Sequence, residues 1–523
     1  MTPKTTILIS GYFGLFPVGR HAISFLGCLL KNPENELYIN SDFVTKETAK
    51  IFDLFFKQEL AQGLIHKDTE KPADFVYDFN VFPYPLPPIG VPWTDLDKFY
   101  KKQAKIKVCY PVFDGTIPPL EWVDVINKRF DLCLSPSRYC AHNLKRHGVK
   151  IDCLPLPCSV LLDDLLGITP TYSPDRKYRF GCISANETRK NLPLLIEAFS
   201  QAFTKRDNVE LYIHSIQRPD ILCTDEDLTA AYKAAKDSCH IILEKGFISH
   251  KQMMEKWKSF DAYVCPQAIT GYFTTPAEAM AAGIPCILSD IAVHRELAEF
   301  VPDSFNLFYV KHNKMSSFFH GVFNYRNLGL KFETVAEDYA NKMKEVYRLQ
   351  DTLLAPDLIN QRKTSVAALT ISGLSASYDG IFHPKKVVIS QRAQQTKDAL
   401  FVSSTLAGLY KEAGLVDSFS KVPQTYTEPT YPEENSDVFK GIEQAAVESQ
   451  RVYIKCAQTA TMRPDKAVDL VPLISPYPPL GKLNRKVLRY GAWGLVKFLL
   501  LQATVWCGIK KIFRKPKKGK EGF

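Results

Sequence analysis

The sequence has no C-x-x-C pair of cysteines, and its 13 cysteines are scattered singly along 523 residues. An odd number of isolated cysteines argues against a disulfide framework and favours reduced thiols in a cytosolic compartment. The first residues do not predict a secretion signal either, because one lysine precedes the short apolar run Ile7-Leu-Ile9, which Gly11 soon follows. An apolar run of that length predicts a first β-strand instead.

The main body of the chain also lacks a surplus of positive charge. Residues 1–481 carry 54 Lys and Arg against 55 Asp and Glu, whereas residues 482–523 carry 12 against one. The net charge of +10 therefore belongs to the C-terminal tail, and a nucleic-acid groove across the body is not indicated. The length, with 46% hydrophobic residues, allows two or three domains with separate cores.

Short apolar runs alternate with helical patterns through the first 160 residues, which predicts βαβ units and a parallel sheet. The expected strands are Ile7–Ile9, Leu37–Ile39, Phe75–Tyr77, Ile106–Tyr110, Leu132–Ser135 and Ile151–Leu154. The expected helices are Arg20–Lys31, Lys46–Gln62, Glu121–Lys128 and Tyr139–His147. The stretch Phe82–Trp93 contains five prolines and is expected to be an irregular surface loop or lid.

After a Pro-rich passage the same alternation starts again. Strands are expected at Arg179–Ile183, Glu210–His214, Ile241–Leu243, Ala262–Cys265 and Cys286–Leu288. Helices are expected at Leu192–Phe203, Asp225–Ser238, Lys251–Ser259 and Ala277–Ala282. Two successive doubly wound units predict two similar α/β domains that face one another, with ligands at the carboxyl ends of their strands.

Two loops with glycine lie at such strand ends. The first, residues 11–19, contains Gly14 and Gly19, whose missing side chains let the backbone approach a ligand closely. Its spacing is not G-x-G-x-x-G, so it predicts no dinucleotide site. The second, residues 270–275, feeds a helix expected to open at Pro276 and to stop at Gly283.

The N-terminus of this second helix offers free N–H groups and the positive end of the helix dipole to an anion such as a diphosphate. Glu278, in its first turn, can accept hydrogen bonds from sugar hydroxyls, although an acid there often only complements the dipole. Arg189 and Lys190 are adjacent cations before another helix, where the dipole disfavours them. An anionic ligand would offset the unfavourable interaction of these two cations with the helix dipole. The alternative is that they are two solvated loop residues without a ligand.

Three segments in this order resemble the C-terminal half of glycosyltransferase family 4, whose members have the GT-B fold. They read ETRKNLPLLIEAF at 187–199, GFISHKQMMEKWKSFDAYVCPQ at 246–267 and GYFTTPAEAMAAGIPCILSD at 271–290. PVGRHAISFLGCLL after the first strand and FDLCLSPSRY at 130–139 extend the resemblance more loosely to residues 5–345. It implies two Rossmann-like domains, an acceptor domain at 1–165 and a nucleotide-sugar donor domain at 170–345, followed by crossover helices at 346–385.

The resemblance also implies a donor site without a metal ion or another cofactor. Arg189 and Lys190 fit the family's diphosphate-binding pair, Glu278 resembles the carboxylate on the nucleotide ribose, and the base lies near Gly246-Phe247. The donor-binding residues expected from the two glycine-containing loops and the three matching segments are Gly14, Gly19, Arg189, Lys190, Phe247, Gly271, Tyr272, Phe273, Thr274, Thr275 and Glu278.

Two residues are expected to act at the reacting sugar. Thr270 stands where the family carries a first glutamate; its hydroxyl can hydrogen-bond a sugar but cannot stabilise an oxocarbenium-like transition state by charge. Asp114, beyond a strand end that faces the expected cleft, is the candidate carboxylate, and an Asp-Gly turn is its alternative. His21 and His294 are weaker candidates, because a histidine beside a helix start is more often structural.

Residues 386–481 form an extension of unknown role, with a linker-like stretch at Pro423–Asn435 and a helix expected at 436–450. Residues 482–523 alternate bases and apolar residues at helical spacing. Tyr490–Ile509 is long enough to span a bilayer, but Lys497 near its centre would cost about 2.5–3.5 kcal/mol. An amphipathic helix lying on an anionic membrane surface avoids this cost and is favoured over a spanning helix. A helix packed on the protein's own core, with a solvated basic tail, is the alternative.

Together these features predict a retaining glycosyltransferase that moves a sugar from a nucleotide-diphosphate sugar to a glycan or lipid-linked acceptor. The expected setting is cell-surface polysaccharide or glycolipid synthesis, with the protein attached to the cytoplasmic face of a membrane. Two alternatives stay open: a GT-B-like protein that binds nucleotide sugar or glycan without transfer, and a nucleotide-sugar epimerase.

Overall fold

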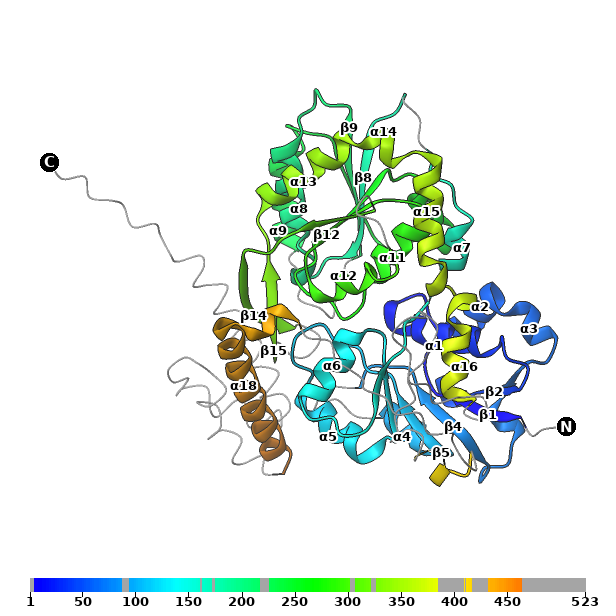
Figure 1. Ribbon diagram of the computed structural model, residues 1–523. Helices are drawn as coiled ribbons and strands as arrows, with labels where there is room; N and C mark the ends of the chain where they lie inside the picture. The colour runs from blue at the N-terminus through cyan, green and yellow to red at the C-terminus, as the bar shows by residue number, and fades with distance from the viewer. Residues whose placement is uncertain are drawn as a thin grey trace, which may run out of the picture.

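The protein is built from two parallel α/β domains that lie one above the other (Figure 1). The computed structural model describes the following residues: 4–86, 94–159, 162–171, 175–216, 225–301, 306–320, 326–383, 409, 411–415 and 431–462. The basic tail at 482–523, with its expected membrane-surface helix, lies outside the described residues. Within them, no helix combines the length and the hydropathy that crossing a bilayer requires.

The first domain holds a seven-stranded sheet in the order β3-β2-β1-β4-β5-β6-β7, and every neighbouring pair is parallel. Its strands are β1 (Thr5–Ile9), β2 (Asn35–Ile39), β3 (Ile65–Lys67), β4 (Val76–Phe82), β5 (Gln103–Cys109), β6 (Leu132–Ser135) and β7 (Cys153–Pro155). Its helices are α1 (Pro17–Leu29), α2 (Lys46–Phe55), α3 (Lys57–Ala61), α4 (Thr94–Tyr100), α5 (Leu120–Arg129) and α6 (Arg138–Arg146). The short helix α7 (Leu162–Leu166) follows β7 and lies beside α11 (Thr274–Ala281) of the second domain (Figure 1).

The second domain holds a six-stranded parallel sheet in the order β10-β9-β8-β11-β12-β13. Its strands are β8 (Tyr178–Ala185), β9 (Val209–Ile216), β10 (Ile241–Lys245), β11 (Ala262–Cys265), β12 (Cys286–Ser289) and β13 (Leu307–Val310). Its helices are α8 (Leu192–Ala202), α9 (Asp225–Ala235), α10 (His250–Lys258), α11 (Thr274–Ala281) and α12 (Ala292–Leu297).

Both sheets change direction of winding at one strand pair, β1 with β4 in the first domain and β8 with β11 in the second. Loops that leave the carboxyl ends of strands at such a switch point form the usual ligand crevice of these folds. The loops after β1, β8 and β11 therefore stand where a ligand is expected. They contain residues 11–16, 186–191 and 266–273.

A hairpin and four helices follow the second sheet. β14 (Lys314–His320) and β15 (Arg326–Glu333) pair antiparallel, and α13 (Ala336–Arg348) and α14 (Gln350–Leu353) come next. The chain then crosses back between the domains, because α15 (Pro356–Val366) lies on the second domain beside α11 and α16 (Ile371–Phe382) lies on the first beside α1 (Figure 1).

A long C-terminal helix, α18 (Asp437–Met462), runs beside the β14–β15 hairpin and α5 (Figure 1). A 3-10 turn at Pro432–Asn435 precedes it, inside the stretch that the sequence presents as a linker. The helix expected at 436–450 is thus present and extends twelve residues further, to Met462.

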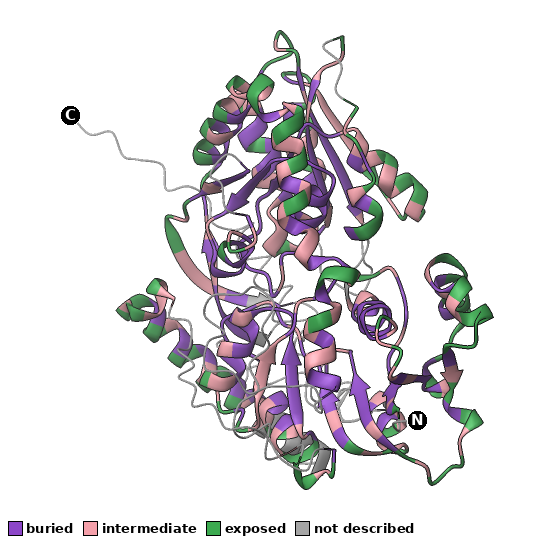
Figure 2. Ribbon diagram, turned by 45° about the vertical axis from the view of Figure 1, so that its right-hand side comes forward, coloured by how far each residue is buried: buried purple, intermediate pink, exposed green. Residues whose placement is uncertain are grey.

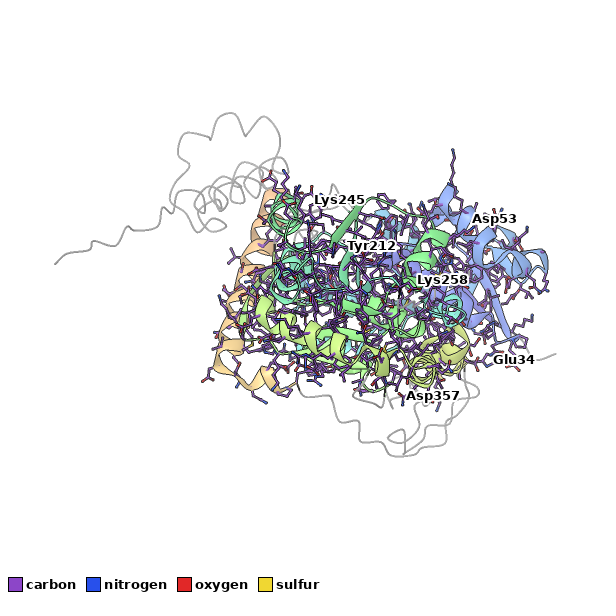
Figure 3. All side chains as sticks on the ribbon, turned by 90° about the horizontal axis from the view of Figure 1, so that it is seen from above. Glu34, Asp53, Tyr212, Lys245, Lys258 and Asp357 are labelled. Atoms are coloured by element: carbon purple, nitrogen blue, oxygen red, sulfur yellow. The ribbon has the colours of Figure 1, made fainter. Side chains whose placement is uncertain are left out.

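Buried apolar strands carry the core of both domains, and they appear as the buried strands in Figure 2. Ile7, Leu8 and Ile9 are all fully buried, as expected for a parallel sheet that is covered on both faces. Other charged residues lie on the outside: Asp53 and Asp357 are exposed and lie at the outer edge of the molecule in Figure 3.

The structure corrects several expected elements. Lys46–Gln62 is two helices rather than one, since Phe56 leaves the helical conformation (φ −134°, ψ 20°) and its side chain is buried. The helix expected to open at Pro276 begins at Thr274, which places the proline in its third position. The sequence pattern also did not indicate β3, β13, β14 or β15.

Candidate active site

The loop after β11 touches the first domain through Gly271. Its N–H donates to Asp114 Oδ1 over 2.8 Å, and its carbonyl accepts from the Ser137 hydroxyl over 2.8 Å. A Cβ on Gly271 would lie 2.3 Å from the Phe113 carbonyl oxygen, so only glycine allows this approach. The backbone contact fixes the second domain's loop against the strand end that carries Asp114.

Asp114 is the centre of a charged cluster between the domains. Its carboxylate lies 3.0 Å from the Arg189 guanidinium and 3.3 Å from His320 Nε2, and Arg189 also pairs with Glu187 over 2.8 Å. Burial opposes the ionisation of Asp114, but Arg189, His320 and Lys190 outweigh it and hold the pKa of the carboxyl well below its usual range. Asp114 is therefore a fixed anion and not a proton donor.

Lys190 differs from its neighbour Arg189. In the part of the chain that the structure describes, no carboxylate lies within ion-pair distance of its ammonium group, and burial together with Arg189 lowers its pKa to about 8. The Cys265 thiol connects it to α11: burial raises the pKa of this thiol, whereas Lys190 and a hydrogen bond with Thr275 lower it. Lys190 is thus a cation that Glu187 and Asp114 reach only beyond ion-pair distance, in a turn that is bonded to the loop leading into α11.

Local backbone geometry puts the two cations there. They lie in a 3-10 turn at Thr188–Lys190, and Asn191 then takes the left-handed conformation (φ 51°, ψ 37°) before α8 begins. Asparagine tolerates this conformation better than most residues. The turn is held against the loop after β11, because Ala268 N–H donates to the Arg189 carbonyl over 2.8 Å.

Two buried amides beside this turn have polar atoms without a partner among the described residues. Asn186 is 1% exposed, and neither its Oδ1 nor its Nδ2 forms a hydrogen bond within the described residues. Gln267, which is 5% exposed, has an unpartnered Oε1. Buried polar atoms are rarely left unsatisfied, so these groups fit a site that takes a polar ligand.

Glu278 lies in α11 and is 2% exposed. Its carboxylate forms an ion pair with Arg20 of α1, from the opposite domain. Burial raises the pKa of Glu278, and Arg20 counteracts that rise. Gly283 (φ +79°) ends α11 in the left-handed conformation that glycine adopts readily, as the sequence predicts.

The remaining residues of the loop after β11 are largely engaged in the protein itself. Thr270 is 4% exposed, and its hydroxyl donates to the Tyr272 carbonyl over 3.0 Å. The Tyr272 hydroxyl donates to the Cys158 carbonyl over 2.9 Å, which forms another contact between the domains. Phe273 is 1% exposed and belongs to the core, so its backbone is the part left to face a ligand.

The loop after β1 contributes residues of the first domain that contact the second domain. Gly14 and Gly19 pack on one another, because a Cβ on Gly19 would lie 2.6 Å from the Gly14 nitrogen. Phe16 of this loop meets Phe247, beyond β10 of the second domain, in an edge-to-face pair with ring centres 5.7 Å apart. Phe247 is 66% exposed, so this pair lies at the surface.

The two histidines named from the sequence are both buried. Burial and then Arg20 lower the pKa of His21 to about 3, and its ring packs edge-to-face on Tyr110. Burial lowers the pKa of His294 to about 4; its Nδ1 is bonded to the Ser289 carbonyl over 2.8 Å, and its Nε2 lies 4.0 Å from the Cys265 sulfur. Both are neutral at pH 7, which favours a structural role.

The comparisons with known proteins concern the second domain and the fold. Residues 177–322, which carry Arg189, Lys190 and the loop after β11, match the family described as glycosyl transferases group 1. A protein of Sulfolobus islandicus rod-shaped virus 1 described as uncharacterized glycosyltransferase 335 is 26% identical over 265 residues, covering 48% of this chain and 73% of that protein. The protein is a glycosyltransferase.

This glycosyltransferase has the GT-B fold, with two parallel-sheet domains and a similar solved structure. Anabaena Alr3699/HepE, solved with UDP and glucose, is similar with a TM-score of 0.51 and 10% identity, covering 72% of this chain and 98% of that one. A glycosyltransferase of Rickettsia africae ESF-5 is similar with a TM-score of 0.48 and 12% identity, covering 73% and 98%. The two facing parallel-sheet domains agree with that fold, as the sequence resemblance implies.

Several residues of the glycosyltransferase's site were not indicated by its sequence. Arg20, Ser137 and His320 contact Glu278, Gly271 and Asp114 respectively. Each contact joins positions more than a hundred residues apart, and a local pattern carries no signal for such a pairing. Among the described residues of the glycosyltransferase, no group of three or more His, Cys, Asp or Glu side chains could hold a metal ion.

Proposed function

We propose that this glycosyltransferase transfers a sugar from a nucleoside-diphosphate donor to a glycan or lipid-linked acceptor with retention of anomeric configuration. The observation that carries the proposal is Lys190, a half-buried cation that has no ion-pair partner among the described residues. Its turn is bonded to the loop that leads into α11, and the backbone N–H groups at the start of that helix also favour an anion. A diphosphate supplies the negative charge that this arrangement lacks.

In this proposal the chain acts mainly by charge stabilisation of the leaving group. As the bond between sugar and phosphate breaks, negative charge grows on the diphosphate oxygens, where Lys190 and the α11 N–H groups stabilise it. Asp114 contributes from the first domain as a fixed anion, oriented by Gly271 and Arg189. It is suited to accept hydrogen bonds from sugar hydroxyls or to face the positive charge that develops on the sugar.

The donor to test first is a UDP-sugar. Support comes from the similar fold of Alr3699/HepE, which binds UDP and glucose in its crystal structure. The experiment is an incubation of the protein with a panel of UDP-, GDP- and ADP-sugars and of glycan and lipid-linked acceptors, in which nucleotide release is measured and the anomeric configuration of the glycoside product is determined by NMR. Release with retained configuration supports the proposal, and inverted product contradicts the mechanism.

We also propose that the reaction needs no metal ion, since the negative charge of the donor is met by Lys190 and a helix N-terminus. An excess of EDTA should then leave the rate of nucleotide release unchanged. A loss of activity that Mg²⁺ or Mn²⁺ restores would contradict this part of the proposal.

For the setting, we propose peripheral attachment to the inner face of a membrane through residues 482–523, in cell-surface polysaccharide or glycolipid synthesis. Support comes from the 12 bases of this segment and from its apolar residues at helical spacing. The full chain should float with anionic vesicles but not with neutral ones, and deletion of 483–523 should abolish flotation while donor binding persists. Flotation of the truncated protein would contradict the assignment.

One observation favours a second candidate, a protein that binds nucleotide sugar without transferring it. The Thr270 hydroxyl is engaged with the Tyr272 carbonyl, and it provides no carboxylate at that position. Tight binding of donor with no nucleotide release in the presence of a broad acceptor panel would select this candidate over a transferase.

A further inference from the structure

The ion pair between Arg20 and Glu278 joins the two domains inside the site. The side chains are 11% and 3% exposed, so both charges are largely removed from water. In the described part of the chain, Arg20 is the one hydrogen-bond or ion-pair partner of the Glu278 carboxylate. Removing one member of such a pair leaves the other as a buried, uncompensated charge.

Arg20 is itself held in place. Its Nε donates to the Leu15 carbonyl over 2.7 Å, which ties the guanidinium to the loop after β1. The next residue, Phe16, packs on Phe247 of the second domain. The segment 15–20 therefore contacts the second domain at two places, α11 and the end of β10, and the guanidinium approaches Glu278 from a supported position.

The contact with Arg20 is made by Oε1 of Glu278 and by one guanidinium nitrogen. A carboxylate has two oxygens and about four acceptor sites, so it can hold an arginine and still accept hydrogen bonds from a pair of sugar hydroxyls. Burial raises the pKa of Glu278, and Arg20 opposes that rise, so the guanidinium favours the ionised form of the carboxylate, which accepts hydrogen bonds.

We propose that Arg20 is a positioning residue for the donor: from the first domain it orients the Glu278 carboxylate toward the ribose hydroxyls of the nucleotide. The inference rests on the proposed nucleoside-diphosphate donor. It assigns to the first domain a share in nucleotide recognition, so that ribose binding depends on the arrangement of the two domains seen in the structure.

The test compares nucleotides with and without ribose hydroxyls. Affinities of the full chain are measured by calorimetry for UDP, GDP and ADP and for the 2′,3′-dideoxy analogue of each. The variants are Arg20→Met, Arg20→Lys, Glu278→Gln and the double variant Arg20→Met with Glu278→Gln. Arg206→Met, which changes an exposed arginine far from the pair in sequence, is the matched control.

The wild type is expected to prefer the hydroxylated form of its nucleotide by roughly tenfold or more, as for hydrogen bonds to a charged group. Arg20→Met should reduce this preference to the level of Glu278→Gln, and the double variant should lower it no further. Arg20→Lys should restore part of it. The double variant also removes the unpaired buried carboxylate. If Arg20→Met alone folds poorly, the preference for the hydroxylated nucleotide can therefore be measured in the double variant.

An unchanged preference in Arg20→Met would overturn the inference. An equal loss of affinity for the nucleotide and for its dideoxy analogue would also overturn it, because Arg20 would then bind the diphosphate. A gain in affinity would overturn it too, because Arg20 would then block the site. If no nucleotide binds to the wild type, the proposed function falls and this inference falls with it. If the wild type binds a nucleotide and Arg20→Met keeps the same preference for the hydroxylated form, only this inference is overturned.

Discussion

At the scale of single residues, the site divides its positive charge between two roles. Arg189 faces Asp114 and Glu187 and is neutralised by them, whereas Lys190 has no such partner among the described residues. The sequence places the two cations side by side and presents them as equivalent. The structure separates them, and of the two it is Lys190 that has no ion pair with a described residue and is left for an anionic ligand.

The depressed pKa of Lys190 predicts a pH dependence of nucleotide binding. With a pKa of about 8, this lysine is charged at pH 7 and largely neutral at pH 9 in the free protein. A diphosphate favours the charged form, so binding above pH 8 must be accompanied by proton uptake. Affinity for UDP should therefore fall as the pH rises from 7.5 to 9.5, by up to about tenfold per unit above the pKa.

The matched control is Lys190→Arg, because a guanidinium stays charged over this whole range. Its affinity should change little between pH 7.5 and 9.5 when measured by calorimetry in buffers of equal ionic strength. The same decline in the wild type and in Lys190→Arg would show that another group titrates, and would remove Lys190 from the account.

Residue chemistry was partly predictable from the sequence. A cation pair before a helix, a carboxylate in α11 and a carboxylate after β5 are local patterns, and all of them lie near the contact between the domains. The partners of these groups were not predictable. Arg20 is 258 residues from Glu278 and His320 is 206 residues from Asp114, and only the folded chain brings them together.

At the scale of elements, the loop after β11 is held where it touches the first domain. Its glycine at position 271 packs on the Phe113 carbonyl oxygen, which is backbone and cannot move aside as a flexible side chain can. Gly271→Ala should lower the free energy of unfolding by about 1–3 kcal/mol. It should also lower the rate of nucleotide release under conditions in which the variant is still folded. Urea denaturation and the nucleotide-release assay measure the two effects.

Gly441→Ala is the comparison, since a Cβ there meets no atom within 4 Å and the residue lies inside α18. This change should be neutral or stabilise by up to about 1 kcal/mol. A Gly271→Ala variant as stable and as active as Gly441→Ala would refute the close approach of the two domains at this loop.

A second element contact lies at the start of α6. Glu296 of α12 accepts from the N–H groups of Arg138 and Tyr139 over 2.9 and 2.6 Å, and from the Tyr431 hydroxyl over 3.2 Å. It thereby caps a helix of the other domain. Glu296→Ala leaves buried donors without a partner and should cost about 1–3 kcal/mol of stability.

Glu299 is the matched control for this cap, because it also contacts Arg138 but from a half-exposed position. Glu299→Ala should cost no more than about 1 kcal/mol, as usual for surface ion pairs. Equal losses in the two variants, measured by denaturation at pH 5, would argue against Glu296 as a link between the domains.

Burial of Glu296 raises its pKa to about 7, above its ordinary value of 4.5. A carboxyl group with a raised pKa binds more protons in the folded state than in the unfolded state between these two values. Its contribution to stability is therefore present below pH 4.5 and is lost as the pH rises toward 7. In Glu296→Gln, the part of the pH dependence between 4.5 and 7 that this group causes should disappear from the denaturation midpoint.

Elements with strong local patterns were predictable, and those that depend on distant contacts were not. Leu132–Ser135 and Ala262–Cys265 have the limits expected, because they are short apolar runs between clear turns. The β14–β15 hairpin was missed. The Leu328 carbonyl accepts from Thr116 and Ile117 N–H over 3.0 and 3.1 Å, so residues of the first domain support β15.

At the scale of the whole molecule, the repeated βαβ pattern was enough to predict two facing domains. It could not predict how they are held together. The C-terminal extension takes part in this: Gln450 of α18 accepts from Leu120 N–H over 2.9 Å and donates to the Asn327 carbonyl over 2.9 Å, which links the first domain to β15. Glu443 of the same helix pairs with Arg146 of α6 over 2.6 Å.

The central claim is that a nucleotide diphosphate binds between the domains at Lys190 and the start of α11. The most direct test is the affinity for UDP of the wild type, of Lys190→Met and of Lys251→Met, an exposed lysine of α10 that serves as control. We predict that Lys190→Met weakens binding by about 10- to 100-fold, as expected for a charge-assisted hydrogen bond, while Lys251→Met binds as the wild type does. Equal affinity in all three proteins would contradict the account.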